Sequence, residues 1–201
     1  MAIISTRPVI GLIKTRWRNR KAPRTLEDRA GVIGANIWKI ALDVYKHLEK
    51  DGFRFGSDQQ VTAVITEFIA FLVQLTDRAV HGRRNDTDRA SLINAVAGHL
   101  AKTMENNQLD LLGPGDYRKP FIQTLNDRFE DYARFEYIGR DPGYACLCYF
   151  GGKVSDAMAS SDNKWVLEQM MEVETPEMVR CIKKLVDEVV EEDASRTADR
   201  Q

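Results

Sequence analysis

The segment Gln59–His81 constrains the fold more than any other part of the sequence. Drawn as a helix, it carries apolar side chains on almost every side. A helix of this kind buries its surface only when other elements surround it, so it belongs in the middle of a helical bundle. Ser57 or Asp58 provides an N-cap, and Gly82 follows its end. The apolar positions are Val61, Val64, Ile65, Phe68, Ile69, Phe71, Leu72, Val73 and Leu75.

Other segments with apolar residues at helical spacing flank this central one. They are Leu26–Lys50, Asp86–Asn107, Asp116–Ile138, Tyr144–Ser160, Lys164–Met171 and Thr175–Glu192. Thr175 followed by Pro176 is typical of a first helical turn, so we expect a separate last helix to begin there. Because short turns separate long helices, we predict an all-α protein, an antiparallel bundle of about five to seven helices. Residues 25–192 form its single domain.

The two ends of the chain are predicted to lie outside this domain and differ in charge. Residues 1–24 form a basic N-terminal arm, and residues 193–201 form a polar tail after an acidic last helix. Opposite charges at opposite ends favour attraction within one chain or between two copies. An acid-free, arginine-rich beginning is also typical of a mitochondrial transit peptide. We expect a bacterial cytoplasmic protein, with the mitochondrial matrix as the alternative if the first ~24 residues are such a peptide.

A polar stripe crosses the apolar segment and is the main candidate site. Glu67, Gln74 and His81 are seven residues apart and therefore share one face of a helix, and Asp77 precedes His81 by one turn. His99 lies at the edge of the apolar face of the next predicted helix. If the two helices are antiparallel neighbours, Glu67, Asp77, His81 and His99 could meet as a ligand-binding cluster.

The alternative is that this stripe faces water, with His81 serving only as a helix stop. The Glu-x-x-His spacing of di-metal bundles is absent from the sequence, so we expect neither a metal site nor a cofactor. Three cysteines do not form a disulfide framework. Cys146 and Cys148 point about 200° apart on a helix, which favours core packing over metal chelation.

The basic arm contains the second candidate site, for nucleic acid or an anionic membrane surface. A tryptophan among basic side chains is a composition that binds single-stranded nucleic acid or anionic lipid. Its residues are Arg16, Trp17, Arg18, Arg20, Lys21 and Arg24. The alternative is a solvated terminus without a ligand.

Three functions therefore follow from the sequence, and it does not choose among substrates, ligands or partners. The first is a non-enzymatic helical interaction or accessory protein with a protein partner, which also self-associates, for example as a homodimer. The second is a helical-bundle metal- or ligand-binding protein or enzyme that uses the cluster around Glu67. The third is a nucleic-acid or membrane-surface binder that uses the basic arm. No Ser–His–Asp or Cys–His arrangement can be argued from three histidines, and no apolar run is long enough to span a membrane.

Overall fold

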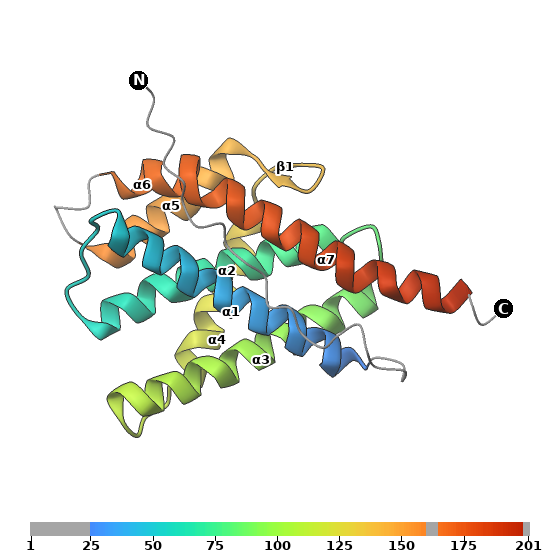
Figure 1. The fold of residues 1–201 in the computed structure, drawn as a ribbon, viewed down its shortest axis with the longest axis horizontal. Helices are drawn as coiled ribbons and strands as arrows, with labels where there is room; N and C mark the ends of the chain where they lie inside the picture. Colours follow the sequence, from blue (N-terminus) through green and yellow to red (C-terminus); the bar gives the residue numbers. More distant parts are fainter. Residues whose placement is uncertain (1–24, 160–164, 199–201) are drawn as a thin grey trace.

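The protein is mostly helical, which confirms the all-α prediction (Figure 1). The computed structural model describes residues 25–159 and 165–198, and for residues 190–198 it describes the backbone course alone. The predicted basic arm, including Arg16, Trp17, Arg18, Arg20, Lys21 and Arg24, lies outside the described residues. The elements are α1 (Leu26–Lys50), α2 (Asp58–Val80), α3 (Asp86–Leu112), α4 (Arg118–Tyr132), β1 (Tyr137–Ile138), β2 (Asp141–Pro142), α5 (Tyr144–Met158), α6 (Val166–Gln169), the π-helical turn η2 (Met170–Glu174) and α7 (Thr175–Ala198).

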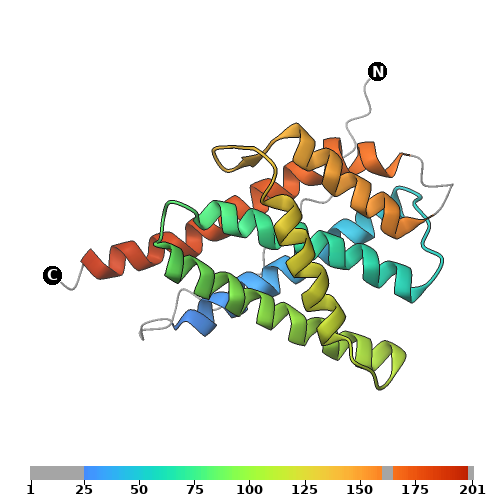
Figure 2. The same cartoon turned by 180° about the vertical axis from the view of Figure 1, so that it is seen from behind.

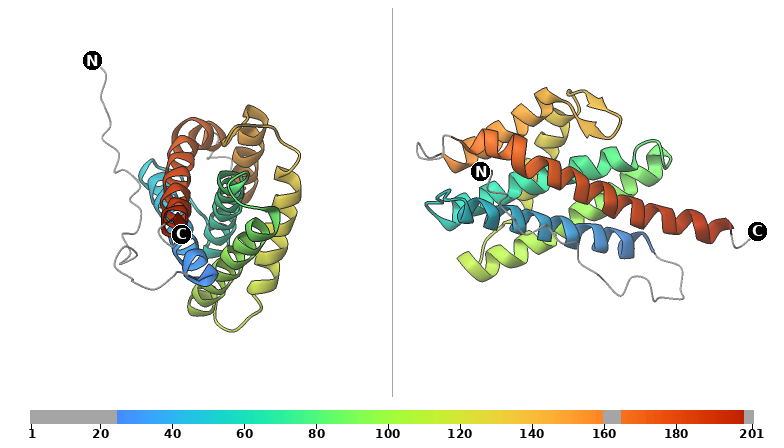
Figure 3. Two further views of the ribbon diagram at one scale, coloured as in Figure 1. Left: turned by 90° about the vertical axis from the view of Figure 1, so that its right-hand side faces the viewer. Right: turned by 45° about the horizontal axis from the view of Figure 1, so that its top comes forward.

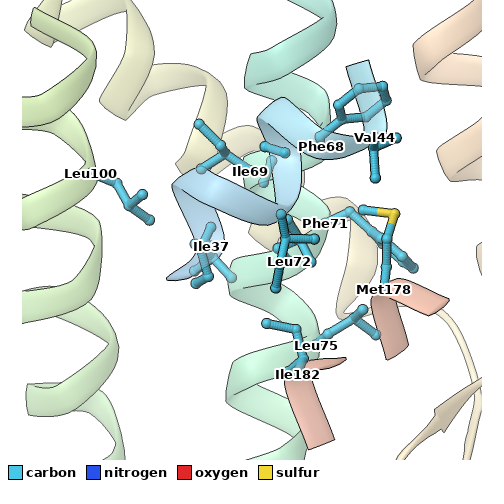
Figure 4. Close-up of a cluster of buried hydrophobic side chains, with 14 of the residues drawn as sticks. Ile37, Val44, Phe68, Ile69, Phe71, Leu72, Leu75, Leu100, Met178 and Ile182 are labelled. Carbon is cyan, nitrogen blue, oxygen red and sulfur yellow. The ribbon is translucent and has the colours of Figure 1, made fainter. Parts of the chain in front are cut away.

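Helix α2 lies at the centre of the fold, as its apolar pattern predicts. It packs against α1, α3, α4, α5 and α7, and nearly every residue of its second half is buried (Figure 3). Figure 4 shows the core at this centre, where Phe68, Phe71 and Leu72 of α2 meet Val44 of α1 and Met178 of α7. Burying a large apolar side chain contributes about 1.5–3 kcal/mol, so α2 organises most of the stabilising contacts.

The predicted helix starts at Thr25 and Ser57 are present. The Thr25 hydroxyl accepts from the Asp28 backbone N–H at 3.1 Å, and the Asp28 carboxylate accepts from the Thr25 backbone N–H at 3.2 Å. This reciprocal capping box satisfies two donors that a helix start leaves free. Ser57 caps α2 through the backbone N–H of Gln60.

Helix α4 ends at Tyr132, six residues before the predicted end at Ile138. Its last turn tightens, with the N–H groups of Arg134 and Phe135 donating to carbonyls three residues earlier. The chain then forms a two-stranded antiparallel hairpin, β1–β2, whose turn includes Gly139 at φ +63°. The Arg78 guanidinium carbon lies 4.6 Å from the centre of the Tyr137 ring. Tyr137 of the hairpin thus contacts α2, and this tertiary contact competes with local helix propensity.

The last helix, α7, begins at Thr175 as predicted, but it is not a separate helix, because α6, η2 and α7 form one continuous helical run. Both the backbone N–H and the hydroxyl of Thr175 donate to the Met170 carbonyl, five residues earlier. Pro176 cannot donate to the Glu172 carbonyl, and its ring would clash with that group in a regular α-helix. The wider π turn accommodates the proline, so the run continues to Ala198, beyond the predicted end at Glu192.

Candidate functional site

Three members of the predicted polar stripe, Glu67, Gln74 and Asp77, are buried, so the stripe is not a solvated face. Glu67 is 6% exposed, Gln74 1% and Asp77 8%. A buried charge is costly unless it is paired and hydrogen-bonded. The partners of these residues therefore define what this region can do.

Glu67 forms a bidentate ion pair with Arg128 of α4. Arg128 Nε donates to Glu67 Oε2 at 2.7 Å, and Nη2 donates to Oε1 at 2.6 Å. The hydrogen bond to Glu67 raises the pKa of Arg128, and partial burial opposes this rise. Both side chains are largely covered: counted on side-chain atoms alone, 8% of Glu67 and 18% of Arg128 is exposed. The parallel N–H donors fix the relative position of α2 and α4 at this point.

This ion pair lines a cavity of about 260 Å³ enclosed by α2, α3, α4 and the loop before α4. Figure 2 shows these three helices from the side on which α4 lies in front. The remaining lining residues are Thr62, Ala63, Thr66, Met104, Gln108, Tyr117, Pro120, Phe121 and Thr124. Aromatic and aliphatic side chains with a few polar groups are the usual composition of a small-molecule site. Ala63 is exposed, so the cavity reaches the surface beside it.

A second polar layer lies further along α2, where Gln74 and Arg78 face the β hairpin and α5. The Tyr137 hydroxyl lies 3.4 Å from the sulfur of buried Cys146. Burial raises the pKa of Tyr137, with a further rise from Cys146, and burial likewise raises the pKa of the Cys146 thiol. A buried thiol of this kind is unreactive, which agrees with the predicted core role of Cys146.

Asp77 faces a different helix and forms its own ion pair. Its carboxylate accepts from Arg89 Nη1 of α3 at 3.1 Å. Burial raises the pKa of Asp77, while Arg89 and Arg78 oppose this rise. Asp77 is ten residues after Glu67, about 15 Å along the helix axis, so the two carboxylates belong to separate pairs.

His99 lies apart from both ion pairs, whereas His81, one turn after Asp77, is close enough to help lower the pKa of the Asp77 carboxyl against the rise that burial causes. His81 is exposed and ends α2, where its backbone N–H donates to the Asp77 carbonyl. His99 of α3 is exposed and covers Gly34 of α1, where an added Cβ would lie 2.6 Å from His99 Cδ2. The structure thus keeps Asp77 and His81 near each other, but places Glu67 beside Arg128 and His99 against α1. Within residues 25–159 and 165–198, no group of three or more His, Cys, Asp or Glu side chains is placed to hold a metal ion.

Sequence reasoning found Glu67 and missed Arg128 and Gln108. The signal that was missed is a polar residue at a position where the helical repeat of the segment otherwise places apolar residues. Arg128 continues the buried row of Phe121 and Leu125 and precedes Tyr132 by four residues. Gln108 likewise continues the buried row of Leu100 and Met104 on α3.

Comparisons with models of known protein families, with curated proteins and with solved structures find no match to this chain. None of the helices that the structure describes combines the length and apolar character needed to cross a membrane. A function for this chain therefore has to be inferred from the geometry of the cavity and of the exposed surface.

Proposed function

We propose that this protein is a helical-bundle protein that binds a small organic molecule in the cavity formed by α2, α3 and α4. The observation that carries the proposal is the buried Glu67–Arg128 ion pair in the wall of an otherwise mostly apolar cavity. Replacing a buried ion pair by apolar residues is often neutral or stabilising, so stability alone does not explain its presence. A ligand that uses these polar groups does explain it.

The lining favours binding over catalysis. The described residues that line the cavity include no cysteine, histidine or lysine, the usual nucleophiles and proton carriers near neutral pH. The three threonine hydroxyls donate to backbone carbonyls of their own helices, and no general base is within hydrogen-bond distance of them. We therefore assign the site to ligand binding without chemical change.

Filling the cavity should abolish binding. Ala63 lies at its exposed mouth, so Ala63→Trp should occupy the space without disturbing the core. We expect fragments detected by ligand-observed NMR with the full chain to bind the Ala63→Trp variant at least about tenfold more weakly, a loss of ~1.4 kcal/mol. Ala90→Trp is the matched control, because Ala90 is also exposed on a helix but lies outside the cavity. Equal binding by both variants, or no fragment binding at all, would contradict the proposal.

A second candidate function, docking of a protein partner, is favoured by exposed apolar side chains on α5, α6 and η2. Tyr144 is 76% exposed and Trp165 68%, and Leu167 lies beside Gly151 of α5. The pKa of Tyr144 is raised by a hydrogen bond with Cys148 and more weakly by the Glu172 carboxylate, which places η2 near the start of α5. Exposed tyrosine and tryptophan side chains are typical binding anchors.

Self-association through this face can be measured directly. We expect sedimentation velocity to show a mass that rises with protein concentration. Tyr144→Ser combined with Trp165→Ser should weaken the association at least about tenfold, because each substitution removes a large aromatic contact. Leu111→Ser is the control, since Leu111 is also exposed but lies at the end of α3. A monomer at every concentration would exclude self-association and leave only a different protein partner.

A further inference from the structure

In the cavity lining, the hydroxyl donors are already used in hydrogen bonds within the protein, whereas some acceptors are not. The hydroxyls of Thr62, Thr66 and Thr124 each donate to the carbonyl oxygen four residues earlier, at 2.8, 2.8 and 3.1 Å. The Tyr117 hydroxyl donates to the Gly113 carbonyl at 3.0 Å. A hydroxyl has a single hydrogen, so none of these four groups retains a donor for a ligand.

The amide of Gln108 is used in the same way. Its nitrogen donates to Thr62 Oγ1 at 2.8 Å and to the Met104 sulfur at 3.8 Å, which occupies both N–H groups. The amide oxygen keeps lone pairs that can accept. Gln108 is 5% exposed, so a hydrogen bond made there would be shielded from water.

The Arg128 guanidinium faces carboxylates on each of its three nitrogens. Nε and Nη2 donate to Glu67, and Nη1 lies 3.8 Å from Asp131 Oδ2. Two carboxylates around one guanidinium leave an excess negative charge. Arg134 also approaches Asp131, at 3.6 Å, but its charge is screened more strongly than that of Asp131, because Arg134 is 74% exposed and Asp131 30%.

The oxygens of Glu67 and Gln108 therefore keep free acceptor sites, and Arg128 keeps N–H groups on Nη1 and Nη2, because it donates only two of its five N–H groups to Glu67. Each Glu67 oxygen receives one hydrogen bond from Arg128, whereas a carboxylate has about four acceptor sites. An anionic ligand would find no unpaired cation and would add to the negative charge. A cationic donor would find the Glu67 and Gln108 oxygens and would offset that charge.

We propose that the ligand is a small protonated amine with an apolar or aromatic body, an inference that depends on the proposed binding function. Its ammonium group donates to the oxygens of Glu67 and Gln108. Its body packs against Tyr117, Pro120 and Phe121, and the two aromatic faces attract the cation.

Three compounds of similar size and different charge test this assignment by isothermal titration calorimetry on the full chain: 2-phenylethylamine, 2-phenylethanol and phenylacetate. We expect the amine to bind at least about tenfold more tightly than the alcohol, and phenylacetate to bind more weakly still. Glu67→Gln should remove the preference for the amine. Glu130→Gln is the matched control, because it removes the same charge from an exposed position of α4.

The outcomes separate this inference from the proposed function. If the alcohol or phenylacetate binds as tightly as the amine and Ala63→Trp removes that binding, the amine assignment is wrong and the binding site stands. If none of the three compounds binds but other fragments do so in an Ala63-dependent way, the amine assignment is again wrong. If Glu67→Gln does not fold, as judged by circular dichroism, Gln108→Met replaces it, and unchanged amine affinity in that variant contradicts the proposal.

Discussion

Replacing Phe71 by alanine should lower the free energy of unfolding by about 3–5 kcal/mol. Phe71 is fully buried, and its ring is stacked on Phe150 of α5 with the centroids 4.0 Å apart. It also contacts Tyr132 of α4, at 5.7 Å between centroids. One side chain thus joins α2 to two other helices. Close packing around it prevents the void that the substitution leaves from closing.

Urea unfolding measures this effect, provided that the slope of the free energy of unfolding against urea concentration is the same in the variant and the wild type. Ile138→Ala is the control, because Ile138 is 75% exposed and its truncation should change stability by less than about 0.5 kcal/mol. A loss below about 1 kcal/mol for Phe71→Ala would show that the neighbouring helices repack and that the stacked rings do not hold them in place.

Replacing Arg128 by methionine should destabilise the protein by about 3 kcal/mol, because it leaves Glu67 buried without its partner. The double variant Glu67→Gln with Arg128→Met should be more stable than Arg128→Met alone, since the uncompensated charge is then absent. We expect a coupling energy of about 1–3 kcal/mol between the two positions.

Chemical denaturation of the wild type, both single variants and the double variant gives this coupling energy. The pair Arg180 and Glu177 provides a control cycle, because it is also bidentate but Arg180 is 52% exposed. Exposed pairs contribute about 0.2–1 kcal/mol. Equal coupling in the two cycles would contradict the view that the Glu67–Arg128 pair is shielded from water.

The central position of α2 could be predicted because its pattern is extreme. Apolar side chains on every side exclude a surface position whatever the other helices do. The end of α4 could not be predicted in this way. Its residues after Tyr132 continue a helical pattern, whereas Tyr137 in the hairpin contacts Cys146, nine residues later, and Arg78 of α2, which local periodicity does not reveal.

The same distinction applies to the candidate site. Glu67 is conspicuous as a carboxylate in an apolar helix, so local sequence identifies it. Its partner is 61 residues away, and the amphipathic pattern of α4 also fits an arginine on a solvated face. The sequence groups Asp77 with Glu67 because Asp77 precedes His81 by one turn and His81 shares the helix face of Glu67. Their ten-residue separation directs them to Arg89 and Arg128, on different helices.

The π turn η2 also helps to keep one side of the long C-terminal run buried. Among the buried residues of this run, five are spaced four apart, at Val166, Met170, Glu174, Met178 and Ile182, with Thr175, Val179 and Cys181 buried beside them. In a regular α-helix, with about 100° of rotation per residue, such a row would drift by about 40° at each step. A π turn advances more residues per revolution and so reduces this drift where it occurs. Deleting one residue from Met170–Glu174 should therefore restore regular winding and leave the apolar side of α7 facing α2, because the π turn holds one residue more than an α-helical turn.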